Sequence, residues 1–353
     1  MSPVLDLARA DLRDLEPYRH AAWEPALERL HANELPWRPH ADNSVAGLNR
    51  YPEPQPRALV ECLARLYDVA PAELLIGRGS DEAIDLLVRA FCRAEHDSIM
   101  IFPPTFGMYA VAAHIQGAGV VAVPLDRSAG FALDAAAALD GWRAGVKIVF
   151  VCSPNNPTGN LIDAAVIERL CGALAGKALV VVDEAYNEFA RTASVSRWRK
   201  RFPHLVVLRT MSKAFALAGA RCGALIGDPA LVDLLRRMIP PYSLTTASIE
   251  SALHALEPAQ LAGTGARVDR IVQERERLAG LLTGVPRVRR VWPSAANFLL
   301  VECEGSARVL SAGIAAGLLV RDVGSYPGLK GSLRVTVGTP EQNERLVAAA
   351  RSV

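Results

Sequence analysis

Polar side chains gather in the segment 207–223, VLRTMSKAFALAGARCG, directly after an apolar run. Thr210 and Ser212 offer hydroxyl groups, and Lys213 offers an amine. Arg221, eight residues beyond the lysine, adds a guanidinium, which suits the oxygens of a phosphate. A lysine whose pKa is lowered by burial and by nearby positive charge can attack a carbonyl. The segment therefore predicts a site that binds a phosphate ester and forms an imine.

Polar side chains also follow two other apolar runs. In VVVDEAYNEF, Asp183 ends the run and Tyr186 lies three residues further on. A carboxylate at the end of a buried strand needs a cationic partner or good hydrogen bonds. A pyridinium N–H would be such a partner, and Tyr186 could then reach the phenolate oxygen of the same ring. In VFVCSPNNPTGN, Asn156 offers an amide donor from a turn. The simpler structural roles are a helix cap for Asp183 and a turn for Asn156.

The stretch LLIGRGSDEAIDLL predicts a phosphate cradle. Gly77 and Gly79 free the backbone, and Ser80 and Asp81 open a helix. The exposed N–H groups and the dipole of a helix N-terminus favour an anion. Glu82 occupies the position of the third glycine in a dinucleotide fingerprint, so this pattern disfavours a Rossmann nucleotide site.

The elements that must hold these side chains are predicted from short apolar runs between residues 58 and 226. The runs are rich in Val and Ile, as parallel strands buried on both faces are, and they read SIMIF, VVAV, VKIVFV, ALVVVD and LVVL. Helical patterns lie between several of them. In SDEAIDLLVRAF the apolar side chains that fall on one face are Ile84, Leu87, Val88 and Phe91. This alternation predicts an α/β fold with a mainly parallel sheet, which binds ligands at the carboxyl ends of its strands.

The pattern changes outside this region and predicts three parts of the chain. Residues 1–42 are polar and interrupted by prolines, and we expect an N-terminal arm that contributes to a small domain. Residues 43–245 form the large, cofactor-binding domain. Residues 246–353 contain long helical stretches and the strand-like segments NFLLVEC and SLRVTVG, which predict a smaller α+β domain with its own sheet.

Composition excludes several classes of protein. The 353 residues are 51% hydrophobic, with 39 basic and 37 acidic side chains that are dispersed, so we expect no nucleic-acid partner and no membrane surface. The N-terminus lacks a signal-peptide pattern, and no apolar run approaches a membrane span, so we expect a soluble, cytoplasmic protein. The six cysteines lack paired spacing, which indicates reduced thiols and no metal site.

Three segments together resemble a known family. SPNNPTG, VDEAY and TMSKAFALAGARCG, in this order and spacing, are similar to the fold-type I aminotransferases that use pyridoxal 5′-phosphate. The closer resemblance is to the histidinol-phosphate aminotransferase family. It extends over nearly the whole chain through LEPY, NRYPEPQP, GRGSDEAI, FPPTFGMY, VRDVG and LRVTVGT. The resemblance implies a large domain built on a sheet of the seven-stranded type, with a smaller α+β domain.

The resemblance implies four catalytic residues. Lys213 forms an imine with pyridoxal 5′-phosphate and moves a proton between the substrate Cα and the cofactor C4′. Asp183 pairs with the pyridine nitrogen, so the ring can accept carbanion charge. Asn156 and Tyr186 form hydrogen bonds to the 3′-oxygen of the cofactor.

The resemblance also implies further cofactor contacts. Tyr109 matches the aromatic residue that stacks on the pyridine ring, with Phe106 as the alternative. Tyr51 matches a tyrosine that reaches the cofactor phosphate of the neighbouring subunit, so a homodimer with shared active sites is expected. Around the phosphate of the subunit's own cofactor, the resemblance implies the loop glycine Gly79, the backbone at Ser80 and Asp81, and the side chains of Thr210, Ser212 and Arg221.

By this resemblance, two arginines determine which substrate is bound. Strand alternation in SLRVTVG sets Arg334 on the face opposite its apolar neighbours, and Arg321 lies in LLVRDVG. The resemblance implies that they bind the substrate phosphate or the carboxylates of glutamate and 2-oxoglutarate, helped by Tyr18 and Asn33. Which arginine meets which anion stays open. Leu35 stands where the family often has asparagine, and Phe106 stands where tyrosine is common. Both lie near the substrate side, so these differences affect the expected substrate specificity and not the cofactor chemistry.

The implied activity is amino transfer from histidinol phosphate to 2-oxoglutarate, which yields imidazole-acetol phosphate and glutamate in histidine biosynthesis. A threonine-phosphate decarboxylase is the first alternative, since it uses the same cofactor with a phosphorylated amine. An aromatic amino acid aminotransferase is the second. A binding or regulatory protein without enzymatic activity is disfavoured because the chain retains Lys213 and has no basic helix-turn-helix extension.

Overall fold

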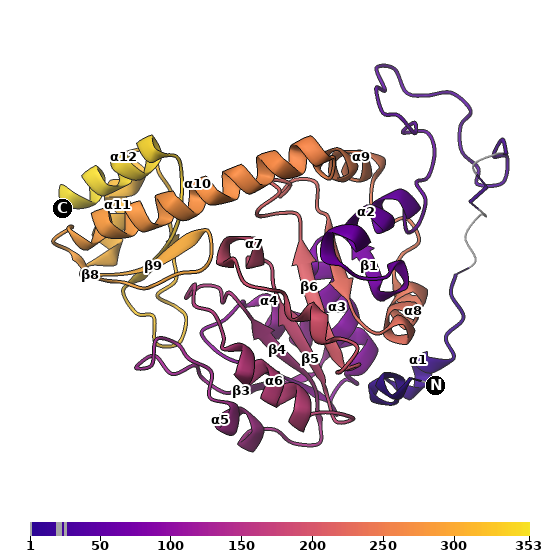
Figure 1. Ribbon diagram of the computed structural model, residues 1–353, viewed down its shortest axis with the longest axis horizontal. Coiled ribbons are helices and arrows are strands. Elements are labelled where there is room, and N and C mark those ends of the chain that lie inside the picture. The colour runs from indigo at the N-terminus through magenta and orange to yellow at the C-terminus, as the bar shows by residue number, and fades with distance from the viewer. Residues whose placement is uncertain (1, 19–22, 25–26) are drawn as a thin grey trace.

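Two sheets of different size organise the chain in the computed structural model, which describes residues 2–18, 23–24 and 27–353 (Figure 1). The larger sheet has seven strands in the order β1-β7-β6-β5-β4-β2-β3. Neighbours from β6 through β5, β4 and β2 to β3 are parallel, whereas β7 is antiparallel to both β1 and β6. The strands are β1 (Leu74–Gly77), β2 (Ser98–Ile101), β3 (Gly119–Ala122), β4 (Val146–Cys152), β5 (Leu179–Asp183), β6 (Leu205–Thr210) and β7 (Gly223–Ile226).

Alternation along the central strands explains why helices cover both faces of this sheet. In β5, Val180 and Val182 pack in one core cluster, whereas Leu179 and Val181 pack in another. Successive side chains of a strand point to opposite faces, so a continuous apolar run requires a helical layer on each side. The first cluster includes residues of α2 (Arg57–Tyr67) and α6 (Ala164–Ala173). The second includes residues of α3 (Ser80–Phe91), α4 (Met108–Gln116) and α8 (Pro229–Met238).

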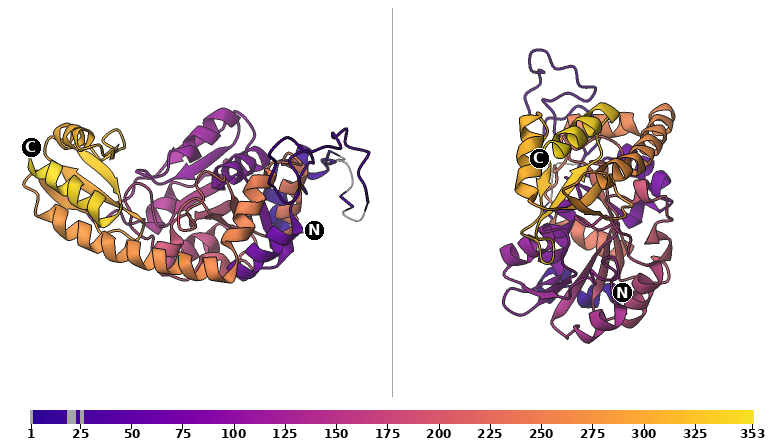
Figure 2. Two further views of the ribbon diagram at one scale, coloured as in Figure 1. Left: turned by 90° about the horizontal axis from the view of Figure 1, so that it is seen from above. Right: turned by 90° about the vertical axis from the view of Figure 1, so that its left-hand side faces the viewer.

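The smaller sheet has four antiparallel strands in the order β10-β11-β9-β8. They are β8 (Val288–Val291), β9 (Phe298–Cys303), β10 (Arg321–Asp322) and β11 (Ser332–Thr336). The helices α11 (Ser306–Ala315) and α12 (Pro340–Arg351) pack with this sheet in a separate core cluster. The long helix α10 (Pro258–Thr283) runs from the large part of the molecule to the small one (Figure 2). The remaining helices are η1 (Pro3–Leu7), α1 (Ala10–Arg13), η2 (Pro71–Glu73), α5 (Ala135–Asp140), α7 (Asn187–Ala190), η3 (Val195–Trp198) and α9 (Thr246–Ala255).

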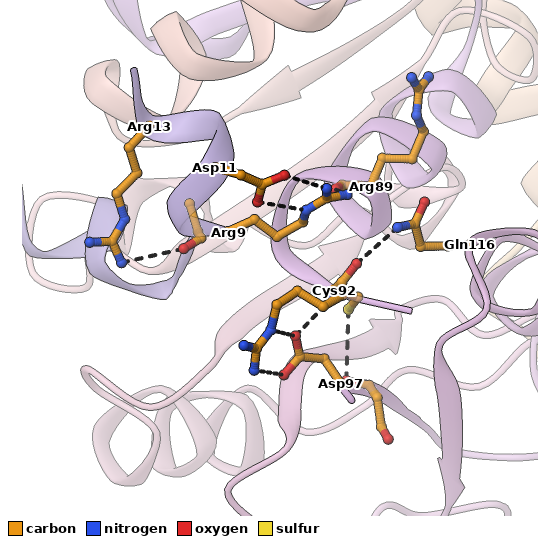
Figure 3. Close-up of polar contacts among 10 residues, drawn as sticks. Arg9, Asp11, Arg13, Arg89, Cys92, Asp97 and Gln116 are labelled. Atoms are coloured by element: carbon orange, nitrogen blue, oxygen red, sulfur yellow. Dashed lines mark hydrogen bonds and ion pairs between the residues drawn. The ribbon is translucent and has the colours of Figure 1, made fainter. Parts of the chain in front are cut away.

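The start of the N-terminal arm packs on the helical layer of the large sheet. Val4 and Leu7 are buried in the cluster that contains α3 and α8. The Arg9 backbone N–H donates to the Ala90 carbonyl oxygen at 3.0 Å, and its guanidinium donates to the Arg89 carbonyl oxygen at 3.1 Å and pairs with Asp11 (Figure 3). These contacts attach the arm at the C-terminal end of α3. The predicted domain boundaries after residues 42 and 245, and a role of the arm in the small domain, stay predictions.

The predicted fold class, an α/β chain with a mainly parallel seven-stranded sheet and a smaller α+β part, is confirmed. The predicted helix over residues 80–91 coincides with α3. The short strands β7, β8 and β10 have no counterpart among the expected strands, and β8 reads VRRV, which lacks a continuous apolar run. Within the part of the chain that the structure describes, no helix has the length and apolar character that a bilayer crossing requires.

Candidate active site

One pocket brings together most of the side chains that the sequence singled out. It lies where β4, β5 and β6 end, at Cys152, Asp183 and Thr210. Parallel strands present their carboxyl ends at the same edge of a sheet, so residues distant in sequence meet there. The lining residues are Ser80, Asp81, Phe106, Cys152, Asn156, Asp183, Ala185, Tyr186, Thr210, Ser212, Lys213, Ala218, Arg221 and Arg334.

Asp183 is the buried acid of the pocket, with a side chain only 2% exposed. Its Oδ2 accepts a hydrogen bond from the Tyr109 hydroxyl at 2.8 Å, and its Oδ1 accepts one from the Ala185 backbone N–H at 3.1 Å. Burial raises the pKa of Asp183 to about 6, against the effect of these two donors. Among the described residues it forms no ion pair. The site therefore contains a desolvated carboxylate without a cation.

Lys213 supplies the amine of the pocket from the loop after β6. Its pKa is lowered, first because the surrounding protein removes water from the ammonium group and then because Arg334 and Arg221 add positive charge. The Lys213 Nζ lies 5.7 Å from the centre of the Tyr186 ring. An amine with a lowered pKa in a pocket is suited to act as a nucleophile and as a proton carrier.

The residues predicted to form a phosphate cradle meet at the N-terminus of α3. The Arg221 Nη1 donates to the Ser212 Oγ at 3.3 Å, and its Nη2 lies 3.3 Å from the Asp81 Oδ2, so the guanidinium joins the loop after β6 to the helix. Gly79 has a φ of +85°, a conformation that L side chains rarely adopt. Backbone N–H groups, hydroxyls and a guanidinium thus converge, as anion binding requires.

Gly223 belongs to this cradle although sequence reasoning did not single it out. A Cβ at this position in β7 would lie 2.6 Å from the Gly79 carbonyl carbon and 2.8 Å from the Ser80 nitrogen. Only a glycine lets β7 approach the start of α3 so closely. The signal in the sequence is its place two residues after Arg221, but only the pairing of β7 with β1 and β6 shows the contact.

The two arginines at the small sheet are direct cross-strand neighbours. Arg321 of β10 pairs with Arg334 of β11, so their side chains lie on the same face. Arg334 lines the pocket and its Nη1 donates to the Asn156 Oδ1 at 2.6 Å, whereas Arg321 is exposed and does not line it. Like charges directly opposite destabilise a sheet unless an anion compensates them. The pair therefore sets two guanidinium groups side by side, and one of them, that of Arg334, lines the pocket.

The position of Tyr109 corrects the expectation that it stacks on a ring bound in the pocket. Tyr109 is fully buried, and its ring stacks on Phe150 with the centres 4.6 Å apart. Phe106 lines the pocket instead and meets the Tyr109 ring edge-on at 5.6 Å. Both belong to FPPTFGMY, and Tyr109 turns inward because it lies within α4, one face of which packs on the sheet. The sequence had left Phe106 as the alternative.

Three further predicted residues do not reach the pocket within this single chain. Tyr51 is 49% exposed and stacks on Tyr242, with the ring centres 4.5 Å apart. Tyr18 is exposed and lines a different cavity, which includes Arg237. Asn33 is exposed, with a φ of +57°. All three lie in the N-terminal part of the chain, which extends away from the two sheets (Figure 2).

Comparisons with known proteins agree with this arrangement. A family model described as aminotransferase class I and II matches residues 24–349. A histidinol-phosphate aminotransferase from Xylella fastidiosa (strain 9a5c) is 50% identical over 99% of this chain and 97% of its own length. One from Stenotrophomonas maltophilia (strain R551-3) is 48% identical over 98% and 96%, respectively.

Solved structures show the same fold. The histidinol-phosphate aminotransferase from Clostridium acetobutylicum has a TM-score of 0.78 at 22% identity, over 86% of this chain and 90% of that one. The corresponding enzyme from Sinorhizobium meliloti, in complex with pyridoxal-5′-phosphate, has a TM-score of 0.76 at 23% identity, over 86% and 83%. These likenesses identify the fold as that of the fold-type I transferases, and together with the match along nearly the whole sequence they show that the chain belongs to the class I and II aminotransferases.

Proposed function

We propose that the chain is a pyridoxal 5′-phosphate-dependent aminotransferase that converts histidinol phosphate and 2-oxoglutarate into imidazole-acetol phosphate and glutamate, a step of histidine biosynthesis. The observation that carries the proposal is the single pocket in which Lys213 and Asp183 stand together with two arginines, Arg221 and Arg334. Relatives that are 46–50% identical over nearly their full length are named histidinol-phosphate aminotransferase.

The residues present fit pyridoxal 5′-phosphate. Asp183 is a buried carboxylate, and no cation among the described residues pairs with it. A protonated pyridine nitrogen would supply the missing positive charge. Because Gly223 has no Cβ, which would lie 2.8 Å from the Ser80 nitrogen, it does not displace the backbone at Ser80 that would bind a phosphate. The residues that would hold the phosphate are Gly79, Ser80, Asp81, Thr210, Ser212 and Arg221, and those that would hold the ring are Phe106, Asn156, Asp183, Tyr186 and Lys213.

When bound, the cofactor supplies a ring that accepts the electron pair released at the substrate Cα. The chain supplies the proton transfers and the orientation. Lys213 Nζ would take the proton from the substrate Cα and deliver it to the cofactor C4′, and its lowered pKa favours the neutral amine that this transfer needs. Asp183 holds the proton of the pyridine nitrogen in place, and the Asn156 amide and the Tyr186 hydroxyl orient the ring oxygen.

The pair of Arg321 and Arg334 supports a substrate with a second anionic group. The Arg221 guanidinium would bind the cofactor phosphate. The cross-strand pair would then bind the phosphate of histidinol phosphate and, in the second half-reaction, a carboxylate of 2-oxoglutarate. Among the described residues Arg334 has the Asn156 oxygen and no carboxylate as partner. This leaves its charge available for a bound anion.

The proposal includes a homodimer with shared active sites. Exposed apolar side chains are concentrated in the N-terminal part of the chain, an arrangement that indicates contact with a partner. They are Leu27, Leu30, Leu35, Trp37, Val45, Leu48 and Tyr51. Tyr51 would reach the cofactor phosphate of the neighbouring subunit, and Tyr18 and Asn33 would contact substrate. We place the enzyme in the cytoplasm, in keeping with its six free cysteines.

An absorbance titration tests the proposed reaction. Histidinol phosphate should convert the bound cofactor from its aldehyde form to its amine form, and 2-oxoglutarate should reverse the change. Threonine phosphate and phenylalanine serve as competing amines in the same titration. Release of carbon dioxide from threonine phosphate would identify a decarboxylase, and a preference for phenylalanine would identify an aromatic aminotransferase.

A further inference from the structure

A buried tyrosine holds the acid of the pocket from behind. The Tyr109 hydroxyl donates to the Asp183 Oδ2 at 2.8 Å, while the Ala185 backbone N–H donates to the Oδ1 at 3.1 Å. One donor therefore serves each oxygen, which fixes the rotation of the carboxylate. An ionised carboxylate has about four acceptor sites, so lone pairs remain for a ligand.

The ring contacts of Tyr109 do not explain why this residue is a tyrosine and not a phenylalanine. Its ring stacks on Phe150 with an interplanar angle of 6° and contacts Phe106 edge-on at 86°, contacts that a phenylalanine would make equally well. A buried phenol needs a hydrogen-bond partner, and here the partner is the carboxylate of the pocket. The side chain thus connects Phe106, on the pocket wall, with Asp183.

The charged and titratable groups around this hydrogen bond come from several elements. Cys152, at the end of β4, is paired in register with Asp183 and faces Tyr109, and its thiol stays neutral because burial raises its pKa. Asp81 of α3 and Glu184 add negative charge, whereas Lys213 adds positive charge. The tyrosine hydroxyl stays protonated, since burial and the charge of Asp183 raise its pKa well above the usual value.

We propose that Tyr109 is a positioning residue for the cofactor: its hydroxyl orients the Asp183 carboxylate and keeps it ionised, so that it can pair with a protonated ring nitrogen. The inference rests on the proposed use of pyridoxal 5′-phosphate and adds a residue that does not touch the cofactor itself. Loss of the hydroxyl would remove a donor that favours the charged carboxylate, so Asp183 would ionise only at higher pH.

A double-mutant cycle tests this role through cofactor binding by the full-length apoprotein. We expect Tyr109→Phe to weaken the binding of pyridoxal 5′-phosphate at neutral pH by about tenfold, the usual effect of a hydrogen bond to a charged group. In an Asp183→Asn background the same substitution should change the affinity by less than about twofold, because no carboxylate remains to be oriented. The acid limb of the binding profile should move up by about one pH unit in the single variant.

Tyr67→Phe is the matched control, because it removes the hydroxyl of a half-buried tyrosine that lies beside Arg209 and does not line the pocket. It should leave the affinity and its pH profile unchanged. Equal losses from Tyr109→Phe in both backgrounds would overturn the inference and assign Tyr109 to packing alone. If wild-type apoprotein does not bind the cofactor, the proposed function itself fails. If it binds but shows no coupling, only the role of Tyr109 fails.

Incorporation of 3-fluorotyrosine at position 109 provides a second test that preserves the packing if Tyr109→Phe does not fold. Fluorine makes the hydroxyl a stronger donor, so the acid limb of cofactor binding should move to lower pH. A profile that moves up or does not move would contradict the role of the hydroxyl.

Discussion

At the residue scale, the chemistry depends on two groups whose ionisation the protein shifts in opposite directions. Burial raises the pKa of Asp183 to about 6, and burial together with Arg334 lowers the pKa of Lys213. Both shifts disfavour charge in the protein without its cofactor. A cationic ring that also carries a phosphate and reacts with an amine satisfies both groups at once, which is why the site fits pyridoxal 5′-phosphate.

Replacement of the lysine tests the assigned amine. Lys213→Ala should reduce the rate of amino transfer by about 10⁴-fold, the upper range for a general acid–base group, while the protein keeps its fold. Single-turnover absorbance with histidinol phosphate measures the effect. Lys177→Ala, which removes a lysine that donates to the Ala173 carbonyl oxygen and lies over the Trp142 ring outside the pocket, should retain full activity. Retained turnover in Lys213→Ala would exclude the lysine as the proton carrier.

The raised pKa of Asp183 predicts how the stability of the apoprotein depends on pH. A carboxyl whose pKa is about 6 in the folded state, above its ordinary value of 3.8, stabilises the fold below pH 4 and loses this contribution as the pH rises through 6. Between pH 5 and pH 8, wild-type apoprotein should lose about 1 kcal/mol relative to Asp183→Asn. Urea unfolding at both pH values measures the difference. A difference of the opposite sign would show that the carboxylate is stabilised by a partner in the apoprotein.

At the element scale, the phosphate cradle depends on how closely β7 approaches the N-terminus of α3. A Cβ on Gly223 would lie within 2.8 Å of Gly79 and Ser80 backbone atoms, which cannot move aside as a flexible side chain would. The cradle is therefore a property of packed elements and not of the loop sequence alone.

Gly223→Ala tests this packing. It should weaken the binding of pyridoxal 5′-phosphate by at least about tenfold and destabilise the protein by about 1–3 kcal/mol, because α3 must shift. Gly172→Ala in α6, where a Cβ would meet nothing within 4 Å, is the control and should stabilise the protein slightly. Equilibrium titration of apoprotein and urea unfolding give the two quantities. Unchanged affinity in Gly223→Ala would separate the cradle from this contact.

The pairing of β10 with β11 sets Arg321 beside Arg334, which lines the pocket, and we propose that Arg321 takes part in binding the substrate anion. Arg321→Gln should raise the KM for histidinol phosphate by about tenfold with a smaller change in kcat, because a guanidinium contributes ground-state binding of the anion. The control is Arg289→Gln, an exposed arginine of β8 that pairs with Glu304. Steady-state kinetics at constant 2-oxoglutarate measure both. If kcat falls and KM does not change, Arg321 does not bind the substrate anion.

At the scale of the whole molecule, the pocket formed by a single chain includes Lys213 and Asp183 but not Tyr51, Tyr18 or Asn33. Residues 29–51 are held by contacts with one another: the Glu34 carboxylate accepts a hydrogen bond from the Tyr51 backbone N–H at 2.7 Å and pairs with Arg50 and Arg29. A segment held in this way, with exposed apolar side chains, is suited to cover a second subunit.

Sedimentation of the purified protein should therefore give a mass twice that of the chain. Tyr51→Phe should weaken cofactor binding by about tenfold, since it removes one hydrogen bond to a phosphate, and leave the dimer intact. Tyr242→Phe, which keeps a ring beside Tyr51, is the control. A monomer that retains full activity would contradict the shared site.

The sequence by itself determined the class of fold and the central chemistry, because each depends on local patterns. Val-rich runs that must be buried on both faces predict parallel strands, and polar residues directly after such runs meet at one sheet edge, as Asp183, Asn156 and Lys213 do. The tertiary structure alone decided the contacts that depend on packing angle and register. Helix α4 turns Tyr109 inward and leaves Phe106 on the wall, and β10 sets Arg321 opposite Arg334. Such contacts join residues whose relative direction no local pattern specifies, so they appear only when the elements pack.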